Sequence, residues 1–375
     1  MKVPFVDLKA QHKSVRAEIN TAICDVLDNA SFILGKCVSD FETAFARKHA
    51  VRYCYGLSSG TAGNHTVLWA LDIRPGDEVI VPANTFIATA WGAILCGATP
   101  VFVDCEPDSY NIDPEKVEVA ITPHTKAIVA VHLYGQSANF DPLQRVADKY
   151  DVRLLEDCAQ AHCAEYKGRK VGGLGIAASF SFYPSKNLGA CGEAGAVTTN
   201  SQQLGERFRM LRDHGSSRKY WHEMYGHNYR MEGIQGAVLG IKLKYLDRWT
   251  EERRRAAAKY RELLADVEEI QLPQEMDYAK HVYHLFVIQV KNQQGGIRDQ
   301  LANFLNENGV STGLHYPIPL HLQPCFQPLR YKKGAFPVTE RLASHGLSLP
   351  IYPELTNEQV SYVAEKIHEF FLCQR

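Results

Sequence analysis

Strand-like segments alternate with helical segments through the first half of this 375-residue chain. The apolar patterns predict strands at 52–56, 78–81, 100–104, 126–131 and 152–156. They predict helices at 11–29, 39–49, 61–72, 86–96, 113–121 and 140–150. This order is typical of an α/β fold, in which a mostly parallel sheet carries helices on both faces. Two further strands at 177–182 and 194–199 would extend that sheet.

The second half of the chain has a different pattern. A pair of helices is predicted at 233–246 and 250–265, followed by a strand at 282–290, a helix at 296–308 and a terminal helix at 356–373. A chain of 375 residues is too long for one small core. We therefore predict a large domain over residues 1–248 and a smaller α+β domain over residues 249–375.

Lys186 follows the predicted strand at 177–182 and precedes a glycine-rich turn. Most lysines in such a place are structural or solvated, so this residue alone is a weak signal. A lysine that is partly desolvated has a lowered pKa, and its neutral amine can attack a carbonyl. The aldehyde of pyridoxal phosphate (PLP) is one such target, and the product is a Schiff base.

Two other segments contain what PLP would require. Asp157 ends a buried strand and precedes an expected helix start. There it can hold the pyridine nitrogen protonated, or it can merely cap that helix. The segment Ser59-Gly60-Thr61-Ala62 opens another predicted helix with small residues, so its N–H groups can bind a phosphate. The same four residues also make an ordinary helix cap, and both roles remain open.

The order of phosphate loop, acid and lysine resembles the fold-type-I PLP transferases, and specifically the DegT/StrS family of nucleotide-sugar aminotransferases. The similarity spans essentially the whole chain and is carried by motifs in a fixed order. These are Pro4-Phe5-Val6-Asp7-Leu8, Pro82-Ala83-Asn84-Thr85-Phe86, Glu156-Asp157-Cys158-Ala159-Gln160-Ala161-His162, the Lys186 segment with Gly192-Glu193-Ala194-Gly195, Asn228-Tyr229-Arg230-Met231 and His315-Tyr316-Pro317.

The resemblance implies roles for several further side chains. Phe86 is expected to lie against the pyridine ring, or alternatively to pack in the core. Gln160 is expected to face the phenolic oxygen of PLP, and Ser181 its phosphate. Asn228 is expected to reach the phosphate across a subunit interface, which implies a homodimer with shared active sites. Arg230 is a candidate for binding a carboxylate of the amino donor, or for a structural ion pair.

The presence of lysine at 186 also implies the type of reaction, because dehydratase relatives carry histidine at that position. Amino transfer from glutamate to a nucleotide-linked keto sugar is expected, through the Lys186 Schiff base and with ping-pong kinetics. Tyr183 stands where members acting at C-4 more often carry histidine, so the resemblance favours C-3 and leaves C-4 as the alternative. Candidate sugar contacts are Tyr183, His315, Tyr316 and His321, and candidate nucleotide-phosphate contacts are Lys219 and Tyr220.

Charge and composition narrow the remaining classes of function. The formal net charge of −1 gives no electrostatic footprint for nucleic acid or anionic lipid. The ten cysteines lack CxxC pairs and metal-type histidine spacing, so we expect reduced thiols and no metal site. We find neither a signal-peptide pattern nor a stretch of roughly 20 apolar residues, so a soluble, cytoplasmic protein is predicted.

Two other interpretations remain open. A regulatory protein could keep the fold and bind PLP without turnover. A Rossmann-type epimerase or dehydratase would bind a nicotinamide, and residues 173–178 match its G-x-G-x-x-A pattern. No strand precedes that match and a strand follows it, so we predict a turn there.

Overall fold

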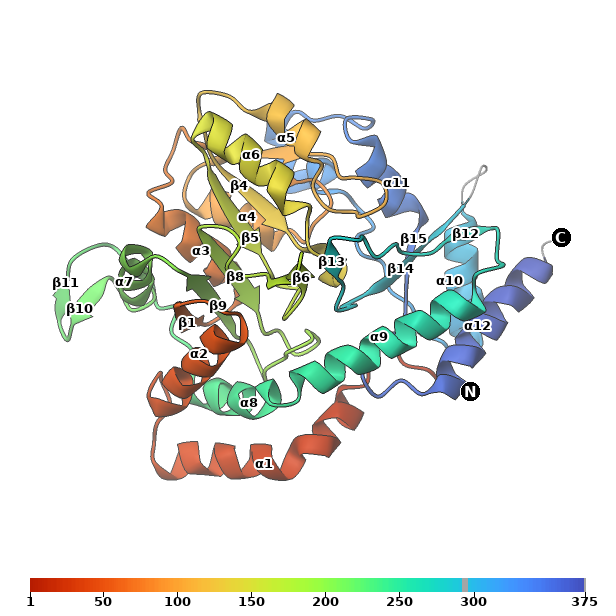
Figure 1. Ribbon diagram of the computed structural model, residues 1–375, viewed down its shortest axis with the longest axis horizontal. Helices are drawn as coiled ribbons and strands as arrows, with labels where there is room; N and C mark the ends of the chain where they lie inside the picture. Colours follow the sequence, from red (N-terminus) through yellow and green to blue (C-terminus); the bar gives the residue numbers. More distant parts are fainter. Residues whose placement is uncertain (292–295, 374–375) are drawn as a thin grey trace.

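The computed structural model describes residues 1–291 and 296–373 of the chain. Within this part, the largest sheet has seven strands in the order β1-β9-β8-β5-β4-β2-β3 (Figure 1). The strands are β1 (Tyr53–Leu57), β2 (Glu78–Pro82), β3 (Thr99–Val103), β4 (Thr125–Val131), β5 (Arg153–Asp157), β8 (Ala177–Ser181) and β9 (Gly195–Thr199). From β3 to β8 all pairs are parallel, whereas β9 runs antiparallel to β1 and β8. The predicted mostly parallel sheet is confirmed.

Helices cover both faces of this sheet (Figure 1). The α-helices of the described residues are α1 (Leu8–Asp28), α2 (Lys36–Lys48), α3 (Gly60–Ala70), α4 (Ala88–Leu95), α5 (Pro114–Ala120), α6 (Phe140–Tyr150), α7 (Gln202–Leu211), α8 (Gly233–Leu243), α9 (Leu246–Leu263), α10 (Ile297–Glu307), α11 (Pro337–His345) and α12 (Asn357–Leu372). Helices α3, α4 and α7 pack on one face, and α2, α5 and α6 pack on the other. None of these described helices has the length and apolar character needed to cross a bilayer.

The central strands are buried on both faces. In β4, Ile128 and Ala130 pack against α5 and α6, while Ala127 and Val129 face the core under α3 and α4. This alternation explains why β4 reads as a continuous apolar run, as strands of parallel sheets do. The helices that cover the sheet have an apolar side to pack against these strands. In α6, for example, Leu143, Val146 and neighbouring apolar residues lie on one side at helical spacing.

The C-terminal part contains a smaller antiparallel sheet in the order β12-β14-β15. Its strands are β12 (Ile270–Gln271), β14 (Phe286–Val290) and β15 (Gly346–Leu349), covered by α9, α10 and α12. Val3 belongs to the same apolar cluster and pairs with Val310, so the N-terminal residues pack with the C-terminal part. The predicted boundary after residue 248 falls inside α9 and stays a prediction.

Several further elements outside the two sheets are short. They are β6 (Glu165–Tyr166), β7 (Arg169–Lys170) and β13 (Ala279–Lys280), which form one sheet, the hairpin β10 (Ser216–Arg218) and β11 (Trp221–His222), and the 3-10 turns at Leu133–Gly135, Leu320–Leu322 and Pro324–Leu329. The hairpin projects from the left side of the molecule in Figure 1. Our prediction also omitted α7, whose start is capped by Ser201, and α11, whose start carries Pro337. Both caps are signals that could have identified these helices.

Candidate active site

A cavity of about 530 Å³ lies where β5 and β8 end and α3 begins. The carboxyl edge of parallel strands is where open α/β sheets bind ligands. Most of the site residues predicted from the sequence line this cavity. They are Ser59, Gly60, Thr61, Phe86, Asp157, Gln160, Ser181, Tyr183, Lys186, His315 and Tyr316. Ala62 is buried next to them in the first turn of α3.

Lys186 forms part of the cavity wall and is only partly exposed to solvent. Burial lowers the pKa of its amine from 10.5 to about 8, and the negative charge of Asp157 acts in the opposite direction. A larger fraction of this amine is therefore neutral at pH 7 than in a solvated lysine. This is the property that a nucleophilic lysine requires.

The loop that carries Lys186 is anchored just after that residue. Nδ2 of Asn187 donates a hydrogen bond to the carbonyl of Val282 at 3.0 Å. Nζ of Lys242 in α8 donates to the carbonyl of Gly189 at 2.7 Å. These contacts come from α8 and from the segment before β14, so the backbone that follows Lys186 is held in place at the cavity wall.

Asp157 ends β5 with its carboxylate buried at the cavity. One oxygen accepts hydrogen bonds from Nδ2 of Asn64 at 3.0 Å and Oγ1 of Thr89 at 2.8 Å, and the other accepts from the amide of Ala159 at 3.0 Å. All three partners are neutral donors, so the negative charge is left for a cation bound in the cavity. The following residues form turns rather than the expected helix start, so Asp157 does not cap a helix. The sequence analysis missed Asn64 and Thr89.

The first turn of α3 combines a helix cap with an open cradle. Oγ of Ser59 accepts the amide of Ala62 at 3.0 Å, which is an ordinary cap. The residues at the cavity wall are Ser59, Gly60 and Thr61. A Cβ at position 60 would lie 2.6 Å from Cβ of Ser181, so only glycine lets α3 approach the end of β8 this closely. The helix dipole and the first N–H groups of α3 thus meet at a place suited to a phosphate.

The opposite wall of the cavity is aromatic. Phe86 is 54% exposed, and its ring lies 5.9 Å from that of Tyr316. Oε1 of Gln160 accepts the amide of Tyr134 at 2.7 Å, and Nε2 donates to the hydroxyl of Tyr316 at 2.9 Å. The exposed Phe86 is a flat apolar surface on which a planar ring can stack. It does not pack in the core, which was its alternative role.

Two histidines line the cavity with Lys186, of which His284 is buried and His315 is part-buried. Burial, together with the positive charge of Lys186, lowers the pKa of His315 to about 4 and that of His284 well below 6.5. Both rings are therefore neutral at pH 7 and add no positive charge next to the amine. His284, Ser185 and Glu193 line the cavity but were missed by the sequence analysis. His284 comes from the C-terminal half, and its place just before β14 was no signal of a site.

Three of the predicted residues lie on exposed segments outside this cavity. Lys219 and Tyr220 connect the strands of the β10–β11 hairpin, and Asn228 is exposed in the segment after that hairpin. Nζ of Lys219 lies 5.2 Å from the ring centre of Tyr220. The roles predicted for these three residues therefore depend on a second subunit or on a bound substrate, and they remain predictions.

Two other predicted residues are engaged in contacts within the chain. Nη1 of Arg230 lies 2.7 Å from Oδ1 of Asp213, the ion pair that was its alternative role. His321 is buried, and its Nε2 lies 3.0 Å from Oε1 of Glu340. Neither Arg230 nor His321 lines the cavity.

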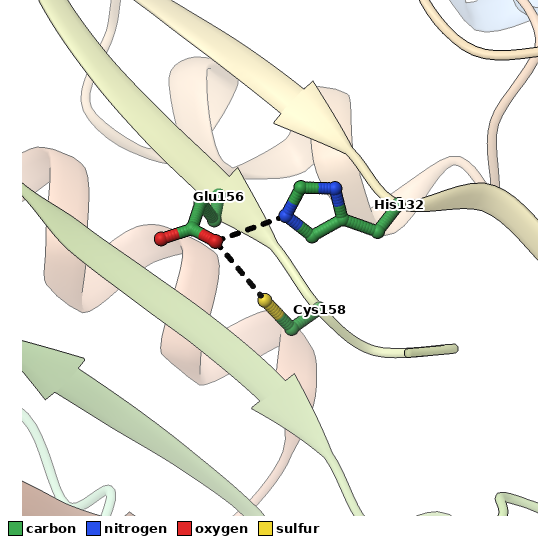
Figure 2. Close-up of side chains that lie close together, drawn as sticks. All are labelled: His132, Glu156 and Cys158. Atoms are coloured by element: carbon green, nitrogen blue, oxygen red, sulfur yellow. Dashed lines mark hydrogen bonds and ion pairs between the residues drawn. The ribbon is translucent and has the colours of Figure 1, made fainter. Parts of the chain in front are cut away.

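A buried cluster of His132, Glu156 and Cys158 lies beside Asp157 (Figure 2). These are residue types that can hold a metal ion. Nδ1 of His132 accepts the amide of Ala138 at 3.0 Å, so its proton is on Nε2, which donates to Glu156 at 3.0 Å. With both ring nitrogens used in this way, His132 has no free lone pair for a metal.

Glu156 also explains the glycine pattern at 173–178. Its two oxygens accept the amides of Gly172, Leu174 and Gly175 at 2.7, 2.8 and 2.9 Å. Residues 171–176 form turns and bends, as predicted, and β8 follows them. The glycine-rich backbone therefore binds an anion that belongs to the protein itself, so this segment is no dinucleotide site.

Comparisons with known proteins show which family and fold this chain is similar to. The sequence model of the DegT/DnrJ/EryC1/StrS aminotransferase family matches residues 13–368. The chain is 44% identical to the dTDP-3-amino-3,6-dideoxy-alpha-D-galactopyranose transaminase of Aneurinibacillus thermoaerophilus, over 98% of this chain and 99% of that one. It is 44% identical to a protein of Geobacillus stearothermophilus named pleiotropic regulatory protein, over 99% of each chain. The X-ray crystal structure of S. venezuelae DesV in complex with ketimine intermediate matches with a TM-score of 0.95 and 42% identity, over 98% of each chain.

Proposed function

The chain belongs to the DegT/DnrJ/EryC1/StrS aminotransferase family, and we propose that it transfers an amino group from glutamate to C-3 of a nucleotide-linked keto sugar with PLP as cofactor. One observation is the main support for this proposal. A single cavity contains the partly neutral amine of Lys186, the buried carboxylate of Asp157 and the N-terminus of α3. These groups match the aldehyde, the pyridine nitrogen and the phosphate of PLP.

The wall residues fit PLP in detail. Asp157 would hold the pyridine nitrogen, since its present partners are neutral and its charge is buried. The cradle between Gly60 and Ser181, where a Cβ has no room, would hold the phosphate. Phe86 would lie against the ring, and Gln160 would face the phenolic oxygen. When bound, PLP supplies a carbon that carries the amino group and a ring that accepts electrons.

The chain's own residues then provide acid–base chemistry. Nζ of Lys186 would take the proton from the α-carbon of glutamate and return it two atoms further along, on the far side of the transferred nitrogen, and it would reverse these steps with the keto sugar. An amine with a pKa of about 8 is suited to this role, because it can both accept and release a proton near neutral pH. Asn64 and Thr89 would keep Asp157 oriented while the ring changes its charge distribution.

The preference for C-3 draws on the Tyr183 motif and on the name of the transaminase from A. thermoaerophilus, which is 44% identical to this chain. Tyr183, His315 and Tyr316 line the open side of the cavity and would contact the sugar. Asn228, Lys219 and Tyr220 would contribute to a neighbouring site in a homodimer. Amination at C-4 is the alternative reaction.

A non-catalytic regulatory protein is the second candidate, because one relative at 44% identity is named pleiotropic regulatory protein. The two candidates make different predictions for the PLP-loaded protein. An enzyme converts bound PLP to its amino form when glutamate is added, and the visible absorbance changes. A regulator of this kind binds PLP and leaves it unchanged.

The test incubates the purified, PLP-loaded protein with glutamate and a panel of thymidine- and uridine-linked 3-keto and 4-keto sugars. Mass spectrometry and NMR then identify the product and the aminated carbon, with the Lys186→Ala variant as control. We expect a 3-amino sugar from at least one 3-keto substrate. A protein that leaves PLP unchanged with glutamate would refute the enzymatic proposal, and a 4-amino product would replace C-3 with C-4.

A further inference from the structure

A second, smaller cavity of about 320 Å³ adjoins the Lys186 cavity. The two cavities share the wall residues Tyr183, Ser185, His284 and His315. We call the smaller cavity the side pocket. Its remaining wall is formed largely by apolar side chains, which include the N-terminal residues Phe5, Val6 and Leu8. The exception is Arg253 of α9, a charged residue at the wall of a largely apolar pocket.

Arg253 is 3% exposed and makes an incomplete set of hydrogen bonds. Its Nη1 donates to the carbonyls of Ile351 at 2.8 Å, Tyr283 at 3.2 Å and His284 at 3.4 Å. Among the described residues all of its hydrogen bonds come from Nη1, and its buried Nε has no partner. The three carbonyls hold the guanidinium in one orientation and leave its other donors without a partner among the described residues.

The surroundings of Arg253 do not neutralise it through a direct contact. Burial lowers its pKa to about 10, and the charge of Glu354 opposes that shift. In the described part of the chain Arg253 forms no ion pair with Glu354, whose Oε2 is buried without a partner. Arg230, which the sequence analysis named as the candidate for binding a donor carboxylate, is paired with Asp213. A buried donor that lacks a partner calls for an explanation, and a bound ligand is one.

We propose that the side pocket binds the side-chain carboxylate of the amino donor through Arg253. The inference rests on the proposed function and adds the basis of donor selection. Guanidinium matches a carboxylate with two parallel N–H donors. Because the side pocket shares four wall residues with the Lys186 cavity, the donor's amino group can lie in one cavity and its second carboxylate in the other. The apolar wall at Phe5 and Leu8 suits the methylene groups that join the donor's amino-bearing carbon to its second carboxylate.

The experiment compares two donors that differ at the side-chain carboxylate. The PLP-loaded protein is mixed with glutamate or with 2-aminobutyrate, and the change in cofactor absorbance gives kcat/KM for each. In Arg253→Gln we expect the preference for glutamate over 2-aminobutyrate to fall at least about tenfold, the usual effect of losing one charged hydrogen-bonded contact. Arg254→Gln is the matched control, because Arg254 is the next residue of α9 and pairs with Glu275 outside the pocket. It should keep the preference.

A binding measurement without turnover accompanies the kinetics. Glutarate has both carboxylates and no amine, so calorimetry with this compound reports binding of the two carboxylates without turnover. We expect Arg253→Gln to weaken glutarate binding at least about tenfold. Arg253→Lys should recover only part of the loss, since an ammonium lacks the bidentate geometry. If Arg253→Gln fails to fold, Leu8→Trp tests the same idea, because it fills the pocket from a residue that is 38% exposed.

The outcomes separate this inference from the proposed function. If the wild-type protein uses glutamate, and if folded Arg253→Gln and Leu8→Trp keep both the donor preference and the glutarate affinity, the side pocket does not bind the donor. If the wild-type protein uses neither donor, the proposed function fails. In that case loss of glutarate binding in the variants would still support carboxylate binding in the side pocket, and unchanged glutarate binding would overturn it.

Discussion

The ionisation of Lys186 can be measured directly in the cofactor-free protein. Trace labelling with isotopic acetic anhydride at each pH from 6 to 11 modifies only neutral amines, and mass spectrometry resolves each lysine. Burial lowers the pKa of Lys186 to about 8, so its labelling should rise tenfold per pH unit and then level off above pH 8. Lys36 is an internal reference, because its hydrogen bond to Asp40 raises its pKa above 10.5 and its labelling should still be rising there.

The expected difference is large. At pH 7 an amine with a pKa of about 8 is about 9% neutral, whereas one at 10.5 is about 0.03% neutral, a ratio of about 300. The shift corresponds to about 3 kcal/mol of preference for the neutral form in the folded protein. Partial exposure at the cavity wall lets the reagent reach Lys186. Its labelling relative to Lys36 should therefore be high and nearly constant up to about pH 7 and should fall above about pH 8.

The Asp157→Asn variant tests the cause of the shift. Asp157 raises the pKa of Lys186, so the variant should level off at a lower pH than the wild type. Labelling of Lys186 that continues to climb tenfold per unit to pH 10 would refute the burial argument. An unchanged or higher plateau pH in the variant would show that Asp157 does not raise the pKa of Lys186.

Three further substitutions test separate parts of the structure. Lys186→Ala should reduce amino transfer at least about 1000-fold, measured as aminated sugar, and retained transfer would remove Lys186 from the chemistry. Gly60→Val should weaken PLP binding at least about tenfold in equilibrium dialysis, because a Cβ there would lie 2.6 Å from Cβ of Ser181. An unchanged affinity would locate the phosphate elsewhere. Glu156→Ala should lower the free energy of unfolding in urea by about 3–5 kcal/mol, because the buried amide of Gly172, the part-buried amides of Leu174 and Gly175, and Nε2 of His132 lose their acceptor. A loss below about 1 kcal/mol would contradict this account.

Local sequence patterns were enough to predict most of the large sheet. The strand predicted at 126–131 is β4 at Thr125–Val131, and the helix predicted at 140–150 is α6 at Phe140–Tyr150. Apolar periodicity depends on neighbours a few residues away, so one segment suffices to read it. The strand predicted at 282–290 was partly wrong, since β14 begins at Phe286. The residues before it pair with the Leu133–Gly135 turn instead, as the bond from Val282 to Gly135 shows.

The sequence by itself determined the fold class and the chemistry-bearing residues at strand and helix ends, such as Asp157, Lys186 and Gly60, because those positions follow from local order. Only the tertiary structure decided which side chains meet them. Asn64 and Thr89 reach Asp157 from two different helices, His284 comes to the Lys186 cavity from the C-terminal part, and Arg253 of the same part lines the side pocket. These contacts depend on which strands are neighbours and on how the C-terminal part packs against them, and no short stretch of sequence contains that information.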